Sequence, residues 1–311
     1  MYWFDNFDSR GFDVLDAHGA PVHIHARVSR GAAKGRPVLL LLHGFPQSHV
    51  LWNRVAAQLD KDFFLVMPDL PGYGDSSKLP GLADHGNYSK RSMAHAMVQV
   101  MNALGIQQFY LCGHDRGGRV SHRLALDHAE RVLRVCVLDI APTLDMYAGT
   151  GFEFAKAYYH WFHLIQPQPI PENMIGGQPV SYLHAKLGGW GSGGTTFFED
   201  AAMAEYERCF CLPGTIHSMC EDYRASASID LEHDRESRAK GEKIRCDLLV
   251  LWGQRGVVHR LFEPLRLWQA QCSGQVSGEA LPTGHYIPEE LPLQTAQHLR
   301  AFFGVANDTA T

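Results

Sequence analysis

Short apolar runs alternate along much of the chain with segments whose apolar residues recur at helical spacing. The runs are rich in Val, Leu, Ile or Phe, which is typical of strands buried on both faces of a sheet. They lie at 38–42, 63–67, 109–112, 135–139 and 248–252, and a last short strand is expected at 275–281. This pattern predicts an α/β fold with a mostly parallel, eight-stranded sheet flanked by helices.

Helices are expected between and after these strands. The segment 93–104 carries apolar residues on one helical face, and Gly105 follows as a helix-ending residue. Further helices are expected at 116–128, 265–271 and 295–303.

The alternation of strands and helices stops between residues 143 and 238. This stretch is rich in aromatic residues, is interrupted by Pro167, Pro169 and Pro171, and has a helical pattern where it is regular. We therefore expect a core formed by residues 1–142 and 239–311, with a helical cap, or lid, inserted at 143–238.

Composition narrows the class of protein. Hydrophobic residues make up 45% of the chain and charged residues 20%, as in an ordinary soluble protein with a sizeable core. The net charge of -5 gives no reason to expect a nucleic acid partner, and no apolar run is long enough to cross a membrane. The first residues lack the pattern of a secretory signal, and the 7 cysteines are an odd number without metal-ligand spacing. A cytoplasmic protein without a metal site is expected.

The segment 113–117, Gly-His-Asp-Arg-Gly, lies between a predicted strand and a predicted helix. It matches the nucleophile elbow of the α/β-hydrolase fold, in which flanking glycines allow a strained turn that exposes the central side chain. The central residue here is Asp115 instead of serine. A role for Asp115 as a simple cap of the following helix is the alternative.

The identity of this residue determines the expected chemistry. A carboxylate is already an anion at neutral pH, so it can displace a leaving group from a saturated carbon and form an ester. Water then has to attack the ester carbonyl. The loop after the strand at 38–42 and the residue after the nucleophile supply oxyanion donors in this fold, so the backbone N–H groups of Phe45 and Arg116 are the candidates.

The remaining catalytic groups follow from position along the chain. His285 lies between the last predicted strand and the last predicted helix, where this fold places its base. The loop after the strand at 248–252 contains no carboxylate, so Asp139, at the end of the strand before the cap, is the expected partner of His285. A turn that begins the cap is the alternative role for Asp139.

Two arginines, Arg116 and Arg119, lie on one face of the first turn of the helix after Asp115. Cations there oppose the helix dipole, and such an unfavourable placement beside a nucleophile suggests a function. Two guanidinium groups could bind a substrate carboxylate. Pairing with acidic residues of the protein itself is the alternative.

Several motifs resemble those of the fluoroacetate (haloacetate) dehalogenases, and they extend from the core through the cap to the last helix. They are the segments 113–121, 138–140, 159–161, 186–190, 220–224 and 284–290. The resemblance implies Asp115 as nucleophile, His285 as base, Asp139 as its partner, and Arg116 with Arg119 as the carboxylate site. It also implies a halide site at His160, Trp161 and Tyr223, with Trp190 lining the pocket.

The resemblance further implies that a small haloacid and water are the reactants, that neither cofactor nor metal is needed, and that the protein forms a homodimer. Two features depart from the family pattern, namely the extra glycines at 191, 193 and 194 and the loop 254–260. An epoxide hydrolase would share the aspartate elbow and would need a cap tyrosine such as Tyr158 or Tyr223 as proton donor. A non-catalytic binding protein is the other alternative.

Overall fold

The computed structural model describes residues 3–33 and 35–304. Their strands form one eight-stranded sheet in the order β1-β2-β4-β3-β5-β6-β7-β8. Strands β3 to β8 run parallel to their neighbours, whereas β1 and β2 form an antiparallel hairpin that joins the sheet beside β4. The strands are β1 Phe7–Leu15, β2 Pro21–Ser29, β3 Val38–Leu42, β4 Phe64–Pro68, β5 Phe109–His114, β6 Val132–Leu138, β7 Asp247–Gly253 and β8 Val276–Leu281.

Each apolar run that predicted a strand lies in the sheet, so the predicted α/β class is confirmed, with boundaries shifted by a few residues. The central strands are buried on both faces, as helix-covered parallel strands should be. The two strands of the hairpin β1–β2 were not predicted from the sequence. Only alternate positions of β2 are fully buried, so this segment lacks a continuous apolar run.

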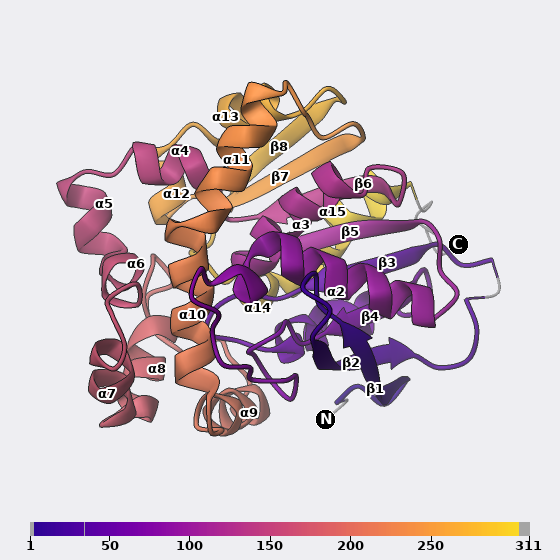
Figure 1. Ribbon diagram of the computed structural model, residues 1–311. Helices are drawn as coiled ribbons and strands as arrows, with labels where there is room; N and C mark the ends of the chain where they lie inside the picture. Colours follow the sequence, from indigo (N-terminus) through magenta and orange to yellow (C-terminus); the bar gives the residue numbers. More distant parts are fainter. Residues whose placement is uncertain (1–2, 34, 305–311) are drawn as a thin grey trace.

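Helices cover both faces of the sheet. In Figure 1, α2 and α3 lie in front of the strands and α15 lies behind them, where α15 packs against α1. The core helices are α1 Asn53–Leu59, α2 Lys90–Ala103, α3 Arg116–Asp127, α12 Val257–Leu261, α13 Pro264–Gln271, α14 Ile287–Glu290 and α15 Pro292–Phe303, with short 3-10 helices η1 His49–Trp52 and η2 Gly86–Tyr88.

The segment between β6 and β7 is helical and forms the left side of the molecule in Figure 1. We call these helices the cap. They are α4 Thr143–Ala148, α5 Phe152–Ala157, α6 Tyr159–His163, α7 Ile170–Gly176, α8 Pro179–Leu187, α9 Asp200–Phe210, α10 Thr215–Ala227 and α11 Ile229–Ala239. None of the helices in the described residues is long and apolar enough to cross a membrane.

Candidate active site

Asp115 lies in a sharp turn between β5 and α3. Its backbone has φ 48° and ψ -114°, which is a strained conformation for a residue with a side chain. A side chain on Gly113 would collide with the carbonyl oxygen of Gly117, so the flanking glycine is required by packing. The Asp115 side chain makes no capping hydrogen bond to α3, so the helix-cap alternative is wrong. The turn instead presents a carboxylate.

One oxygen of this carboxylate already contacts a predicted oxyanion donor. The backbone N–H of Phe45, in the loop after β3, donates to Oδ1 of Asp115 over 2.9 Å. Arg116 is the first residue of α3, so its N–H belongs to the donors at the helix N-terminus that lack a partner within the helix. Both groups are placed beside the carbon atom at which an Asp115 ester would be hydrolysed.

His285 and Asp139 form the pair expected from their positions in the chain. Nδ1 of His285 lies 2.6 Å from Oδ2 of Asp139, and Oδ1 of Asp139 accepts the Gly253 N–H over 2.9 Å. Nε2 of His285 lies 4.0 Å from Oδ2 of Asp115 and has no hydrogen-bond partner among the described residues. The imidazole thus has one nitrogen held by an acid and the other directed to the nucleophile, which is the arrangement that a general base needs.

Electrostatics keep the nucleophile ionised. Burial alone would raise the pKa of Asp115, but His285, Arg116 and Arg119 outweigh burial and hold that pKa below its usual value. Burial would lower the pKa of His285, whereas the hydrogen bond and charge of Asp139 and the charge of Asp115 raise it. Asp115 is therefore an anion at neutral pH.

The two arginines have different partners. Nε and Nη2 of Arg116 each donate over 2.8 Å to the carboxylate of Asp222, which lies on α10. Arg116 thus pairs with an acidic residue of the protein itself, which was the alternative to a role in substrate binding. Its Nη1 nevertheless has no partner among the described residues. Arg119 forms no ion pair within the described chain, and its Nη1 donates to Thr143 over 3.0 Å. Arg119 is a buried cation without a counter-charge of its own.

Aromatic side chains of the cap close over the nucleophile. The ring of His160 stacks on Phe45 at 5.7 Å and lies 4.6 Å from the Trp190 ring and 5.5 Å from the Tyr223 ring. Trp161 lies 6.4 Å from Tyr223 and faces the Arg119 guanidinium at 4.8 Å. The structure thus brings together all four aromatic residues that the sequence resemblance had pointed to.

Two of these residues carry polar atoms without a partner. Nδ1 of His160 and the hydroxyl of Tyr223 are buried and form no hydrogen bond within the described chain. Burial holds the pKa of His160 well below its usual value, so the ring is neutral and can donate one N–H. Buried donors without partners are unfavourable, so these two atoms are available to a ligand or to water.

Sequence reasoning missed the pairing of Asp222 with Arg116, and it named Tyr158 only as a proton donor for the epoxide hydrolase alternative. Asp222 is inside the quoted motif 220–224, but its partner Arg116 is distant in sequence and no local pattern links them. Tyr158 is buried, and its ring lies 5.4 Å from that of His160. Burial, together with Asp139 and Asp115, raises the pKa of Tyr158 well above its usual value, so its hydroxyl stays protonated.

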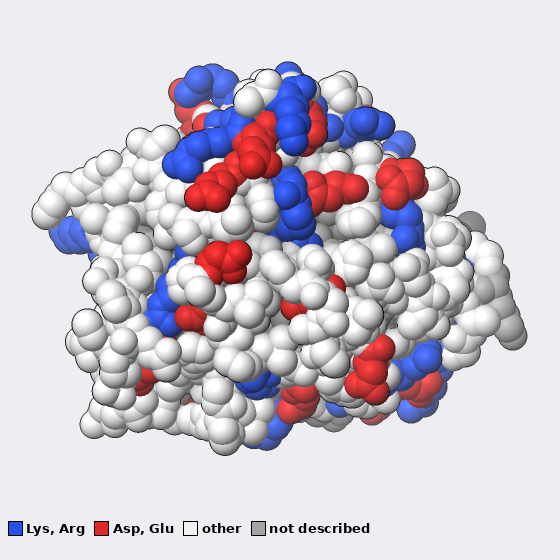
Figure 2. All heavy atoms as spheres, viewed as in Figure 1, with Lys and Arg blue, Asp and Glu red and all other residues white. Residues whose placement is uncertain are grey.

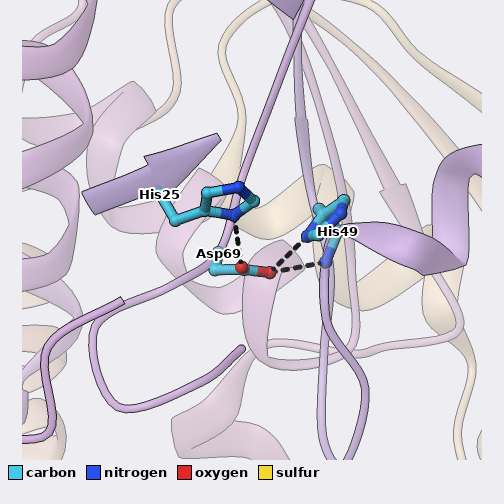
Figure 3. Close-up of side chains that lie close together, drawn as sticks. All are labelled: His25, His49 and Asp69. Carbon is cyan, nitrogen blue, oxygen red and sulfur yellow. Dashed lines mark hydrogen bonds and ion pairs between the residues drawn. The ribbon is translucent and has the colours of Figure 1, made fainter. Parts of the chain in front are cut away.

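A second cluster joins His25 on β2, His49 at the start of η1 and Asp69 in the loop after β4 (Figure 3). Both histidines place Nδ1 2.9 Å from the Asp69 carboxylate, which also accepts backbone N–H groups from His49 and Asp75. Both oxygens of the Asp69 carboxylate thus accept hydrogen bonds from protein donors. The cluster is a hydrogen-bonded support that stabilises the loop after β4. In that loop Tyr73 donates to Asp222 over 2.6 Å, which links the support to the arginine site.

Comparison with known proteins agrees with this architecture. The profile of a family described as alpha/beta hydrolase fold matches residues 37–288. The chain belongs to the α/β-hydrolase family.

More specific relatives share nearly the whole chain. A fluoroacetate dehalogenase from Burkholderia sp. is 41% identical over 303 residues, which cover 97% of this chain and 96% of the relative. The chain belongs to the same family as that protein. A soluble epoxide hydrolase from Corynebacterium sp. (strain C12) is 32% identical over 84% of this chain and 87% of the relative. A structure from Pseudomonas aeruginosa, described as an epoxide hydrolase variant with bound MFA, has a TM-score of 0.87 and 36% identity and covers 97% of both chains.

Proposed function

We propose that this enzyme hydrolytically dehalogenates short 2-haloacids, such as fluoroacetate and chloroacetate, to 2-hydroxyacids. The observation that carries the proposal is Arg119, a buried cation that forms no direct ion pair with any carboxylate of the described residues and lies close enough to Asp115 to lower its pKa. A substrate carboxylate would supply the missing charge. It would bind Arg119 and the remaining Nη1–H of Arg116, and place C2 of the acid over the nucleophile.

In the first step, an oxygen of Asp115 attacks C2 while the carbon–halogen bond breaks and its electron pair leaves with the halide. The donors of His160 and Tyr223, which lack protein partners, stabilise this developing charge together with the indole of Trp161. Fluoride is a poor leaving group and requires such donors most. An ester between Asp115 and the 2-hydroxyacid results.

In the second step, Nε2 of His285 takes a proton from water, and the hydroxide adds to the ester carbonyl of Asp115. The oxyanion is stabilised by the N–H groups of Phe45 and Arg116. When the intermediate collapses, His285 returns the proton to the leaving alkoxide. The 2-hydroxyacid is released, and the Asp115 carboxyl, which keeps the oxygen of water, loses its remaining proton to solvent and becomes a carboxylate again.

Esterification also adjusts the base. The charge of Asp115 is one of the contributions that raise the pKa of His285, and the ester removes it. The pKa of His285 is therefore lower in the intermediate than in the free enzyme. A larger fraction of the imidazole is then unprotonated in the step that needs a base.

Epoxide hydrolysis is the second candidate, and Tyr158 favours it. Its protonated hydroxyl lies near the site and could donate a proton to an opening epoxide. A neutral epoxide, however, would leave Arg119 without a counter-charge.

One assay distinguishes dehalogenation from epoxide hydrolysis. The enzyme is incubated with fluoroacetate, chloroacetate and styrene oxide, and halide electrodes and diol analysis measure the products. Diol formation without halide release would overturn the dehalogenase proposal, and tight ligand binding without any turnover would favour a binding protein.

We also propose that the enzyme forms a homodimer through the cap. Phe152, Ile170 and Met174 on cap helices are 78%, 50% and 65% exposed. In the view of Figure 2, charged side chains gather toward the top, and the left side, where Figure 1 shows the cap, is mostly uncharged. Light scattering of the purified protein tests this proposal, since a monomer at all concentrations would contradict it.

A further inference from the structure

The loop that carries His285 is held by one carboxylate. Oε2 of Glu290 accepts the N–H of Gly284 over 2.8 Å, and Oε1 accepts the N–H of Tyr286 over 3.2 Å. Glu290 therefore binds the residues on both sides of the base. With Asp139 fixing the ring nitrogen Nδ1, these bonds determine where Nε2 points.

The same carboxylate binds the cap loop, residues 188–194. Ser192 donates to Oε1 of Glu290 over 2.6 Å. Arg255 donates to Oε2 over 3.0 Å and to the carbonyl oxygen of Gly191 over 3.1 Å. This segment contains Gly191, Gly193 and Gly194, and two of its residues, Gly191 and Ser192, make the anchoring contacts.

The backbone of the cap loop packs closely against the loops that carry His285 and Arg255. A side chain on Gly284 would collide with the backbone nitrogen of Ser192, and one on Gly191 would collide with the carbonyl oxygen of Arg255. Trp190, on the same loop, has φ 54°, and its ring lies 5.0 Å from the His285 ring. Such strain persists only where neighbouring contacts fix the backbone.

From these contacts we infer that Glu290 is a positioning residue that aligns His285 for ester hydrolysis and fastens the cap loop with Ser192 to the base loop. This inference rests on the proposed two-step reaction. His285 acts only on the ester, so misalignment of its loop slows the second step and leaves the attack of Asp115 on substrate unchanged. A residue that merely stabilised the fold would not separate the two steps.

The test measures both steps by rapid quench and intact mass in the full-length protein. Glu290→Gln replaces an acceptor with an amide N–H that faces backbone donors, so hydrolysis should slow by about 10- to 100-fold and the ester should accumulate. Ester formation should keep its wild-type rate. Ser192→Ala, which removes only the cap contact, should give a smaller shift in the same direction and serves if Glu290→Gln does not fold.

Glu289→Gln is the matched control. Glu289 is the adjacent carboxyl, is bonded to Tyr206, and has its pKa raised to about 8 by burial, so glutamine closely replaces its neutral form. This variant should accumulate no ester. Equal slowing of both steps by Glu290→Gln and Ser192→Ala, or ester accumulation in Glu289→Gln, would overturn the inference. His285→Asn separates the two proposals: without an adduct in that variant, the proposed function itself fails.

Discussion

Arg116 and Asp222 form a two-point ion pair in which both side chains are fully buried and both hydrogen bonds measure 2.8 Å. Lys90 also contacts the Asp222 carboxylate. The acid on cap helix α10 thus pairs with cations of core helices α2 and α3, whereas Arg119 forms no ion pair among the described residues. Cap and core are electrostatically joined at the place where the substrate would bind.

Replacement of Asp222 by asparagine should destabilise the fold. Arg116 would lose its counter-charge and Lys90 would keep only Asp230, and breaking a buried ion pair in this way costs about 3 to 5 kcal/mol. Urea denaturation measures the effect. Glu263→Gln is the control, because its pair with Arg266 is exposed and its loss should change stability by about 0.5 kcal/mol or less. An unchanged urea midpoint in Asp222→Asn would contradict the structural account.

Replacement of Arg119 by methionine should weaken the use of haloacids. Loss of a buried, hydrogen-bonded charge partner costs about 2 to 5 kcal/mol, so kcat/KM should fall at least about 30-fold. Arg119→Lys keeps the charge without the planar fork and should retain part of the activity. Steady-state kinetics with chloroacetate distinguish the variants, and wild-type kcat/KM in Arg119→Met would argue against a carboxylate site there.

His285→Asn should stop the reaction at the ester. Substrate attack by the Asp115 carboxylate does not use His285, so a mass adduct of the acid should appear on the protein and persist. In wild type, a single turnover in oxygen-18 water should place the label in the Asp115 carboxyl. Peptide mass spectrometry reads both results, and unlabelled Asp115 after turnover would be incompatible with the ester route.

The titration of His285 should depend on the charge of Asp115. Because the Asp115 anion helps to raise the pKa of His285, Asp115→Asn should lower that pKa. His285 would then lose its proton at a lower pH than in wild type. The same direction of change is expected in the ester intermediate, where the charge of Asp115 is also absent. NMR titration of the imidazole checks the direction. A pKa that stays equal or rises in the variant would remove the proposed adjustment of the base.

The hydroxyl of Tyr223 should matter most for fluoride. Loss of one donor to a developing anion lowers rates by about 100-fold or more, and fluoride needs hydrogen bonds more than bromide does. Tyr223→Phe should therefore lower the rate with fluoroacetate more than with bromoacetate. Tyr182→Phe, which removes a buried hydroxyl packed near Phe210, should leave the ratio unchanged. Equal losses with both substrates would exclude a leaving-group role.

The residues that sequence could predict are those whose position in the fold is fixed by local pattern. Asp115 follows a buried strand and precedes a helix, and Asp139 and His285 lie in the loops after β6 and β8, so their meeting follows from parallel topology. The partner of Arg116 could not be predicted, because Asp222 reaches it from a cap helix whose docking has no local signal. The hairpin β1–β2 was missed because strands were predicted from continuous apolar runs, which neither of its strands contains. The residue assignments of the site and the cap boundaries stay predictions for experiment.

The position of Asp139 limits how caps can be exchanged between relatives. Asp139 lies four residues before Thr143, where α4 begins. The residue that pairs with His285 therefore lies at the junction between core and cap. A chimera joined upstream of Asp139 would replace Asp139 with the residue of the donor protein. It would thus change the partner of His285 together with the cap. Grafts joined after Pro142 should keep the native Asp139–His285 pair, and the donor cap would then have to supply its own partners for Arg116 and Glu290.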